Sequence, residues 1–215
     1  MKVLRGVEAF DAILTPAERG VIAALTTPRL IQDFLDGLVY SPDLFYRCPL
    51  RVLRERTAHC FDGALFAASL LRRLGYPPLI LEIIPNDADD DHLLALFKRN
   101  GHWGAVAQSN FVGLRFREPV FRTLRELVMS YFEPYYNVAG ARTMRGYTVP
   151  LNLKAFDRVN WMIADAPLDD VADRLDAIRH VSVLTEAMIA ELSPVDERSR
   201  RAGLEGVNEA GLFKV

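Results

Sequence analysis

Residues 57–78 read TAHCFDGALFAASLLRRLGYPP and predict a long, mostly apolar helix near the middle of the chain. Thr57 is a residue type that caps helix N-termini, so the helix is expected to run from there to about Leu74. Gly75 is typical of a helix end, and the two prolines after it prevent further extension. Residues 79–84 are rich in leucine and isoleucine and predict a strand that follows the helix directly.

A hairpin is predicted next, and it makes the expected sheet antiparallel. An acidic loop over residues 86–91 leads to a strand over 92–98, and Asn100-Gly101 is suited to a two-residue turn before a return strand over 102–108. The later elements are expected to be a helix from Thr123 that ends by Pro134, a strand over 149–153, a helical pattern over 167–192 and a less ordered polar tail after Ser193. This order predicts an α+β fold rather than alternating βαβ units.

The first 46 residues read as helical. Thr15-Pro16-Ala17-Glu18 is a capping box with proline at the first helical position, and Thr27-Pro28 repeats that start signal. We therefore predict one compact domain in three segments, which are a helical N-terminal extension over 1–46, an α+β core over 47–165 and a helical C-terminal extension over 166–215.

The composition excludes several classes of protein. Half of the 215 residues are apolar, which excludes disorder of the whole chain. The 26 lysine and arginine residues against 28 aspartate and glutamate residues lack the basic excess of a nucleic-acid binder. No apolar run reaches the ~18 residues that span a membrane, and the first residues lack the apolar core of a signal peptide. Two cysteines are too few for a disulfide framework, so we predict a cytoplasmic protein.

Cys60 is the first candidate for chemistry. It is expected in the first turn of its helix, where unpaired backbone N–H groups and the helix dipole favour an anion. Such a position lowers the pKa of a thiol and makes it a nucleophile. The alternative is a buried apolar cysteine without chemistry.

His92 is the candidate partner of Cys60, because a histidine that opens a strand can serve as a general base or as an imidazolium beside a thiolate. The hairpin register places Ser109 opposite His92 if the turn has two residues, and Gln108 if the loop has three. A bulge near the strand end brings in Asn110 instead. Each of these side chains has an oxygen that can accept from an imidazole. We predict Asn110 as the orienting residue, with Ser109 as the alternative.

Residues 57–78 resemble the nucleophile helix of the transglutaminase-like superfamily, which has a cysteine, an acid two residues later, and then Leu-Arg-x-x-Gly-hydrophobic-Pro. The family continues with a strand, a histidine that opens a strand, and a third residue after a tryptophan on the partner strand. Here these are residues 79–84, His92, and Trp103 followed by 108–110. The resemblance covers about residues 42–115. It implies a papain/transglutaminase-like core in which Cys60 is the nucleophile and His92 the base.

The sequence departs from this family pattern at two positions. The usual third residue is an aspartate, and the hairpin has none after Trp103, although papain-like relatives use asparagine. A small residue commonly precedes the cysteine, whereas His59 does so here, which alters the entrance to the site.

Other sites were weighed and are not predicted. The cysteines and histidines lack zinc-ligand spacing, and the acidic loop lacks the glycine and glutamate of a calcium loop. Nucleotide-binding glycine motifs and a serine-hydrolase motif are absent, so no cofactor or metal is expected. Two basic groups flank the candidate site, and they either recognise an acidic substrate or form ion pairs on the surface. They are Arg47, Arg51, Arg54 and Arg56 before it and Arg115 and Arg117 after it.

Two functions are compatible with these observations. The first is a transglutaminase-like hydrolase or acyl transferase that acts on an amide of a peptide, protein or small molecule through a thioester on Cys60. The second is a catalytically inactive domain of the same fold that serves as a binding or interaction module. The missing aspartate favours the second, and the reactivity of the Cys60 thiol distinguishes them.

Overall fold

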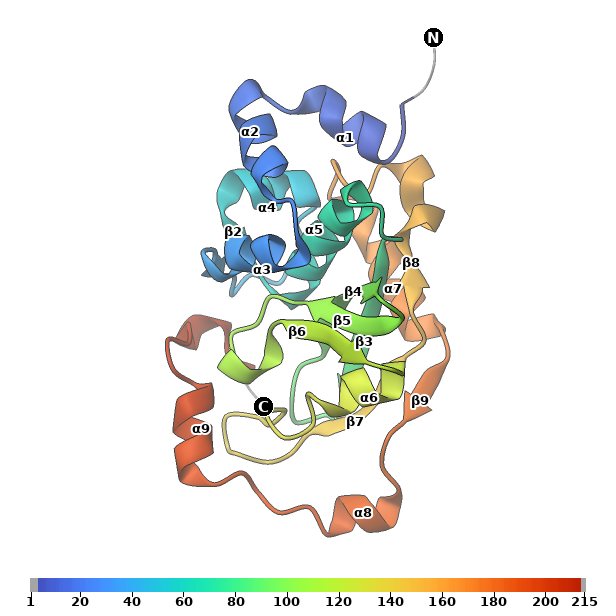
Figure 1. Ribbon diagram of the computed structural model, residues 1–215. Coiled ribbons are helices and arrows are strands. Elements are labelled where there is room, and N and C mark those ends of the chain that lie inside the picture. Colours follow the sequence, from blue (N-terminus) through green and yellow to red (C-terminus); the bar gives the residue numbers. More distant parts are fainter. Residues whose placement is uncertain (1–3, 214–215) are drawn as a thin grey trace.

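A seven-stranded sheet lies at the centre of the molecule in the computed structural model, which describes residues 4–213 (Figure 1). Its strands are β3 (Leu79–Pro85), β4 (His92–Arg99), β5 (His102–Val106), β6 (Arg117–Phe121), β7 (Met144–Thr148), β8 (Leu151–Asn152) and β9 (His180–Ser182). Their order in space is β6-β5-β4-β3-β7-β9, with β8 beside β3, and every neighbouring pair is antiparallel. Two short strands, β1 (Val39–Tyr40) and β2 (Thr57–Ala58), form a separate parallel pair. The prediction of an α+β fold with an antiparallel sheet is confirmed.

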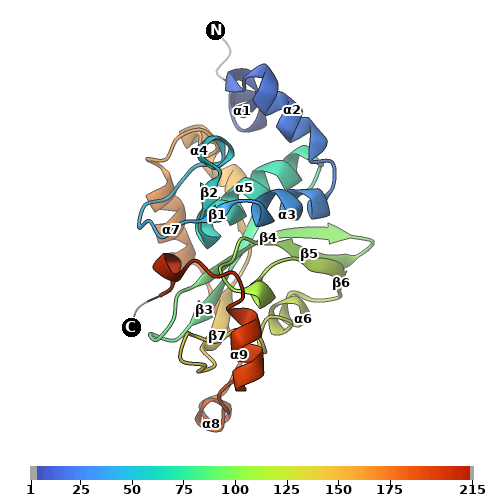
Figure 2. The ribbon, with the colours of Figure 1, turned by 90° about the vertical axis from the view of Figure 1, so that its left-hand side faces the viewer.

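Helices surround this sheet. They are α1 (Val7–Ile13), α2 (Pro16–Ala24), α3 (Pro28–Asp36), α4 (Pro49–Glu55), α5 (Cys60–Arg73), α6 (Leu124–Met129), α7 (Leu168–Ala177), α8 (Glu186–Ala190) and α9 (Glu197–Gly203), with short 3-10 helices η1 (Val112–Leu114), η2 (Leu153–Val159) and η3 (Glu209–Gly211). Three predicted caps are confirmed, because Thr15, Thr27 and Thr123 each accept a hydrogen bond from the backbone of the helix that they precede. Figures 1 and 2 show α1–α5 gathered at one end of the molecule and α6, α8 and α9 at the other.

The sheet separates two apolar cores, because successive side chains of a strand point to opposite faces. Leu93, Ala95 and Phe97 of β4 pack in the cluster that contains α5 and the apolar face of α7. Leu94 and Leu96 pack in the other cluster, with α6 and several tyrosines. Helix α5 is buried along most of its length, so the expected packing of the Cys60 helix on the sheet is confirmed.

The start of α5 differs from the expected one. Thr57 is paired with Val39 in the β1–β2 ladder, so the chain stays extended for two more residues. The N-cap is His59, whose Nδ1 accepts from the backbone N–H of Phe61, and Cys60 is the first helical residue. A histidine is not a strong capping type, so the sequence pattern favoured the nearby threonine.

The C-terminal part also differs from the expected one. The helical pattern over 167–192 contains two helices, α7 and α8, with strand β9 between them. The strand predicted over 149–153 is present only as the two-residue strand β8, and a longer strand, β7, lies just before it. The tail from Ser193 to residue 213 is ordered and contains α9 and η3. Polar residues without strong periodicity occupy these elements, so local patterns did not indicate them.

The hairpin and the sheet edges follow simple rules. Arg99 pairs with His102 across a two-residue turn, and both turn residues, Asn100 and Gly101, have positive φ. This is the turn that Asn-Gly predicts. The outer strands of the sheet are β9, which is short, and β6, which contains Pro119.

Within residues 4–213, none of the helices has both the length and the apolar character needed to cross a membrane.

Candidate functional site

Cys60 opens α5, and the first turn is held by a reciprocal cap. The carboxylate of Asp62 accepts from the backbone N–H of His59 at 3.4 Å, while the His59 ring accepts from the backbone N–H of Phe61 at 3.2 Å. The thiol therefore lies at the N-terminus of a 14-residue helix, in the turn where the sequence predicts it.

A cavity of about 700 Å³ opens next to Cys60. Its wall carries five carboxyl groups, which belong to Asp43, Glu82, Asp90, Asp91 and Asp176. Four aromatic rings also line it, those of Tyr40, Tyr46, Phe61 and Phe213. None of the lysines or arginines in the described part of the chain lines this cavity. We call it the Cys60 cavity.

The Cys60 thiol contacts the backbone just before β4 rather than an imidazole. Its sulfur donates to the carbonyl oxygen of Asp91 at 3.7 Å. Burial raises the pKa of the thiol well above its usual value, and the negative charges of Asp91 and Asp90 raise it further. The thiol is therefore protonated at neutral pH in this arrangement.

His92 lies on the other face of the sheet. As the neighbour of Leu93 in the strand alternation, it points to the cluster opposite α5, and its ring packs near Tyr131 and Tyr135. Its Nε2–H donates to the carbonyl oxygen of Leu114 at 2.7 Å. Burial lowers the pKa of the ring to about 4, so the imidazole is neutral. Within residues 4–213, no hydrogen bond joins the Cys60 thiol to a histidine ring.

The residues expected to orient His92 have other partners. Ser109 and Asn110 line a small second cavity together with His92, so these three predicted residues are brought together. However, the Ser109 hydroxyl accepts from the backbone N–H of Phe111 at 3.0 Å, and the Asn110 amide binds the backbone of Asn208. The expected hydrogen bond from either side chain to the imidazole is not formed in this arrangement.

Gln108 lies on the α5 side of the sheet. A Cβ added to Gly63 would lie 2.3 Å from the Cβ of Gln108, so the helix and this residue are in close contact. The side chain is buried, and its Oε1 has no hydrogen-bond partner. Gln108 thus approaches the helix of Cys60 but not the ring of His92.

A carboxyl pair in the Cys60 cavity was not predicted from the sequence. Burial raises the pKa of Glu82 and, more strongly, that of Asp91, and the two side chains share a hydrogen bond. Such a bond requires a proton on one of the two carboxyl groups. The sequence signal was Glu82 itself, the single acid within the apolar strand over 79–84.

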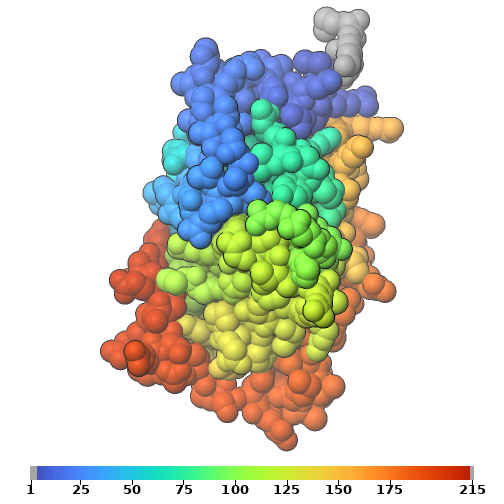
Figure 3. Space-filling model, in the orientation of Figure 1, coloured from blue at the N-terminus to red at the C-terminus, as the bar shows by residue number. Residues whose placement is uncertain are grey.

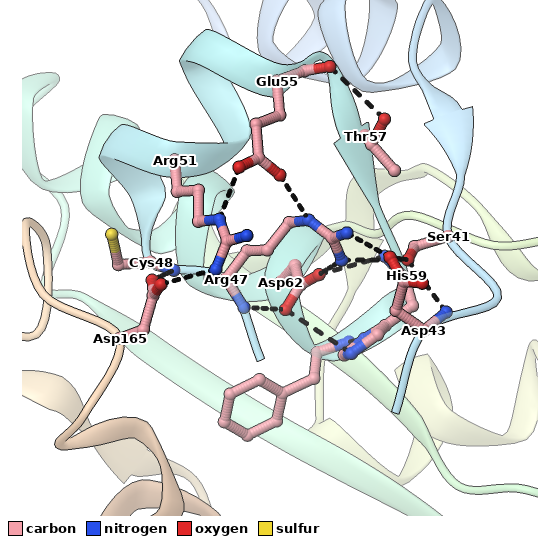
Figure 4. A network of polar contacts seen from close by, with 11 residues as sticks. Ser41, Asp43, Arg47, Cys48, Arg51, Glu55, Thr57, His59, Asp62 and Asp165 are labelled. Carbon is pink, nitrogen blue, oxygen red and sulfur yellow. Dashed lines mark hydrogen bonds and ion pairs between the residues drawn. The ribbon is translucent and has the colours of Figure 1, made fainter. Parts of the chain in front are cut away.

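Residues 41–47 form one wall of the Cys60 cavity, and a network of ion pairs holds this wall in place (Figure 4). The Arg47 side chain is 5% exposed and bridges the carboxylates of Asp43 and Glu55. Its backbone N–H donates to the Asp62 carboxylate at 2.7 Å, which ties this wall to the first turn of α5. Burial raises the pKa of Asp62 to about 7, against the opposing effect of Arg47.

The remaining arginines flanking the site also have internal partners. Arg51 pairs with Glu55 and Asp165, and Arg54 pairs with Glu18. Arg56 stacks over Phe34, and Arg117 stacks over Tyr131. Arg115 forms an ion pair with Asp36. The surface-pairing interpretation of these arginines agrees with the contacts, and the cavity that they flank is acidic.

Cys48 is a structural residue. It precedes α4, is buried, and its backbone N–H donates to Asp165 at 2.8 Å. Burial raises the pKa of its thiol to about 12. Among the described residues, no group of three or more histidine, cysteine, aspartate or glutamate side chains has an arrangement that could hold a metal ion.

Comparisons with known proteins give structural likenesses only. No protein-family model and no curated protein matches the sequence. The EGTA-treated structure of LapG from Legionella pneumophila is similar with a TM-score of 0.41 and 12% sequence identity, covering 74% of this chain and 86% of that one. Another structure of Legionella pneumophila LapG has a TM-score of 0.40 and 13% identity, covering 74% of this chain and 82% of that one.

Proposed function

We propose that this chain is a binding module, of the fold that its sequence resembles, which takes a cationic organic group into the Cys60 cavity. A peptide side chain that ends in an amine or guanidinium has the required chemistry. The observation that carries the proposal is the charge of the wall, which has five carboxyl groups and, among the described residues, no lysine or arginine. A cation in such a cleft gains from each carboxyl group that is ionised and not already paired, because the low-dielectric walls reduce screening.

The aromatic residues of the cavity support the same ligand class. Tyr40 and Tyr46 line one part of it, and Phe61 and Phe213 line others. The face of an aromatic ring attracts a cation, and the contribution grows when the cation is desolvated. Carboxylates and rings together therefore favour an organic cation with an apolar stem.

Binding should release a proton. The hydrogen-bonded pair of Glu82 and Asp91 holds one, and a cation nearby favours the ionised form of both groups. Burial also raises the pKa of Asp90 to about 6. Affinity for a cation is therefore expected to fall as the pH falls through about 6, because each carboxyl that gains a proton no longer attracts the ligand.

The experiment is isothermal titration calorimetry with 1,5-diaminopentane, and 1,5-pentanediol as the uncharged control. We expect the diamine to bind and the diol not to bind, and we expect added salt to weaken binding. At pH 7.5, where Asp90 is ionised, Asp90→Asn should weaken it about tenfold or more, while Asp33→Asn, a carboxylate exposed on α3, should leave it unchanged. Equal binding of diol and diamine, or no effect of Asp90→Asn, would contradict the proposal.

A cysteine enzyme is the second candidate, and one observation favours it. The Cys60 thiol lies in the first turn of α5 and lines a cavity large enough for a peptide segment. In that reaction the thiol would give its proton to His92 as the sulfur bonds to an amide carbonyl carbon, the amine would leave with that proton, and water or another amine would cleave the thioester. Asn110 or Ser109 would orient the imidazole. This requires an arrangement in which His92 reaches the thiol.

The alkylation rate of Cys60 as a function of pH distinguishes the two functions. For the binding module we expect the midpoint to lie above the ~8.5 of a free thiol, and His92→Ala to leave it unchanged. For the enzyme, alkylation persists at mildly acidic pH and His92→Ala raises the midpoint. Peptide mass spectrometry separates Cys60 from Cys48, whose buried thiol reports loss of the fold.

A further inference from the structure

We infer that residues 208–213 form a strap that closes the Cys60 cavity, and that displacement of this strap admits the ligand. The inference rests on the proposed function, since it concerns access to the same cavity. Figure 2 shows the dark red end of the chain running up from α9 to lie beside α7. Figure 3 shows the C-terminal segment following the outer surface of the molecule.

Asn110 holds the strap by two hydrogen bonds. Its Nδ2 donates to the carbonyl oxygen of Asn208 at 2.9 Å, and the backbone N–H of Asn208 donates back to its Oδ1 at 2.8 Å. The Asn110 amide thus makes the same two hydrogen bonds to the backbone of Asn208 that a residue of a neighbouring strand would make. The Asn110 side chain is buried, so both bonds are protected from water.

Tyr40 is the second point of attachment. The Asn208 side chain donates from Nδ2 to the carbonyl oxygen of Tyr40 at 2.8 Å. Gly211 lies against the Tyr40 ring, since a Cβ added there would be 2.8 Å from the ring Cδ1. The strap therefore needs a residue without a side chain at this position.

The strap is a wall of both cavities near the site. Residues 210–213 line the Cys60 cavity, and Gly211 and Phe213 also line the small cavity of His92. Tyr40 and Asp91 are shared in the same way. Displacing the strap would thus remove a wall from each cavity at once.

The strap is weakly held compared with the rest of the molecule. Val183 is the last buried residue in the described chain, and every residue over 184–213 is intermediate or exposed. A segment that buries little apolar surface opens at a low free energy, well below that of global unfolding. A few hydrogen bonds, each with a small net contribution because water competes for the same groups, are compatible with such an opening.

The test compares two variants of the full chain with a matched control. Asn110→Ala removes both hydrogen bonds to Asn208, and Gly211→Val places a side chain against Tyr40. The control is Asn152→Ala, because Asn152 caps η2 and lines neither cavity. The measurement is the rate of Cys60 alkylation by iodoacetamide at pH 9, with Cys48 followed in the same sample.

We expect each strap variant to raise the Cys60 rate about tenfold or more, with the Cys48 rate unchanged, and the control to match the wild type. If the Cys60 rate stays at the wild-type value in both variants, or if both cysteines react faster in parallel, the strap does not control access. Gly211→Val decides the matter if Asn110→Ala does not fold.

The experiments give different results if the strap inference is wrong and if the binding proposal is wrong. If the strap is right and the binding proposal is wrong, alkylation accelerates in the variants but 1,5-diaminopentane binds none of the proteins. If the binding proposal is right and the strap is wrong, the diamine binds at the same association rate to wild type and variants, and alkylation does not change.

Discussion

The imidazole of His92 is buried and neutral at physiological pH, and its Nε2–H donates to the carbonyl oxygen of Leu114. Its folded-state pKa of about 4 lies below the ordinary histidine value of 6.5, so as the pH falls the unfolded chain binds a proton at this residue before the folded chain does. The stability that His92 contributes is therefore fully present above about pH 6.5 and is lost as the pH falls towards 4.

We expect His92→Gln to remove this acid sensitivity. Between pH 6.5 and 4 the wild type should lose up to about 3 kcal/mol of unfolding free energy relative to the variant, measured by urea denaturation at several pH values. His102→Gln, at the hairpin turn, serves as the control and should keep the wild-type pH dependence. Parallel curves for the wild type and His92→Gln would show that the ring is not held neutral.

Asp62 joins the loop over 41–47 to α5, and it is fully buried. Asp62→Ala leaves the guanidinium of Arg47 with one fewer carboxylate and the backbone N–H of Arg47 without its acceptor. We expect a loss of about 3–5 kcal/mol in the free energy of unfolding, as for a broken buried pair. Asp33→Ala, in the exposed pair with Arg29, should cost about 1 kcal/mol or less, and a similar loss in both variants would contradict this reasoning.

Individual site residues were only partly predictable. The cap chemistry and the apolar run after it placed Cys60 in the first turn of a helix, because those signals are local. A contact between His92 and Cys60 requires that the imidazole lie on the face of β4 that packs against α5. In the structure Leu93 occupies that face, so His92 lies on the opposite one. A shift of one residue in a strand reverses the face, and the sequence spacing did not contain that information.

At the scale of elements, α5 approaches β5 and the residues after it unusually closely at Gly63. An added Cβ would lie 2.3 Å from the Cβ of Gln108, so Gly63→Ala forces the helix away from the sheet. We expect a loss of about 1–3 kcal/mol, as for overpacking of a core, measured by urea denaturation.

Gly20→Ala is the matched control for this substitution. Gly20 lies inside α2, and no atom lies within 4 Å of an added Cβ. The substitution should stabilise the protein by up to about 1 kcal/mol, because alanine is the better helix former. Equal effects at the two glycines would show that the close approach of α5 has no energetic weight.

Elements with strong local signals were the predictable ones. The helix of Cys60, the strand that follows it and the Asn-Gly hairpin combine clear periodicity with turn or cap residues. Strands β7 and β9 were not predicted, because β9 has three residues and β7 obtains its place from pairing with β3. Pairing between segments distant in sequence is a tertiary effect that local propensity does not report.

At the scale of the whole molecule, the N-terminal helices belong to the same core as the Cys60 helix. The Phe10 side chain of α1 is completely buried in the cluster that also contains α5 and α7. We expect Phe10→Ala to cost about 3–5 kcal/mol and to shift one cooperative transition. Circular dichroism and the fluorescence of buried Trp161 should report the same midpoint, and two separate midpoints would show that α1 folds independently.

The path of the chain after β9 was beyond sequence analysis. Asn110 and Asn208 are 98 positions apart and meet through hydrogen bonds that no periodic pattern encodes. The segment after Ser193 is polar, so its composition favours a less ordered tail. Its order comes from hydrogen bonds to distant parts of the chain, among them those from Tyr136 to Ser199 and between Asn110 and Asn208.

Pro119 in the outer strand β6 has a consequence for the behaviour of many copies together. An outer strand offers free backbone groups to the strand of another molecule, and chain-to-chain growth of this kind leads to aggregates. Pro119 has no N–H to donate, and Glu118 beside it adds an exposed charge, although Val120 is 65% exposed. The proline therefore interrupts any added strand at its middle, and β9 at the opposite edge is too short to replace it. We therefore expect this one ring to oppose precipitation through strand pairing at high protein concentration.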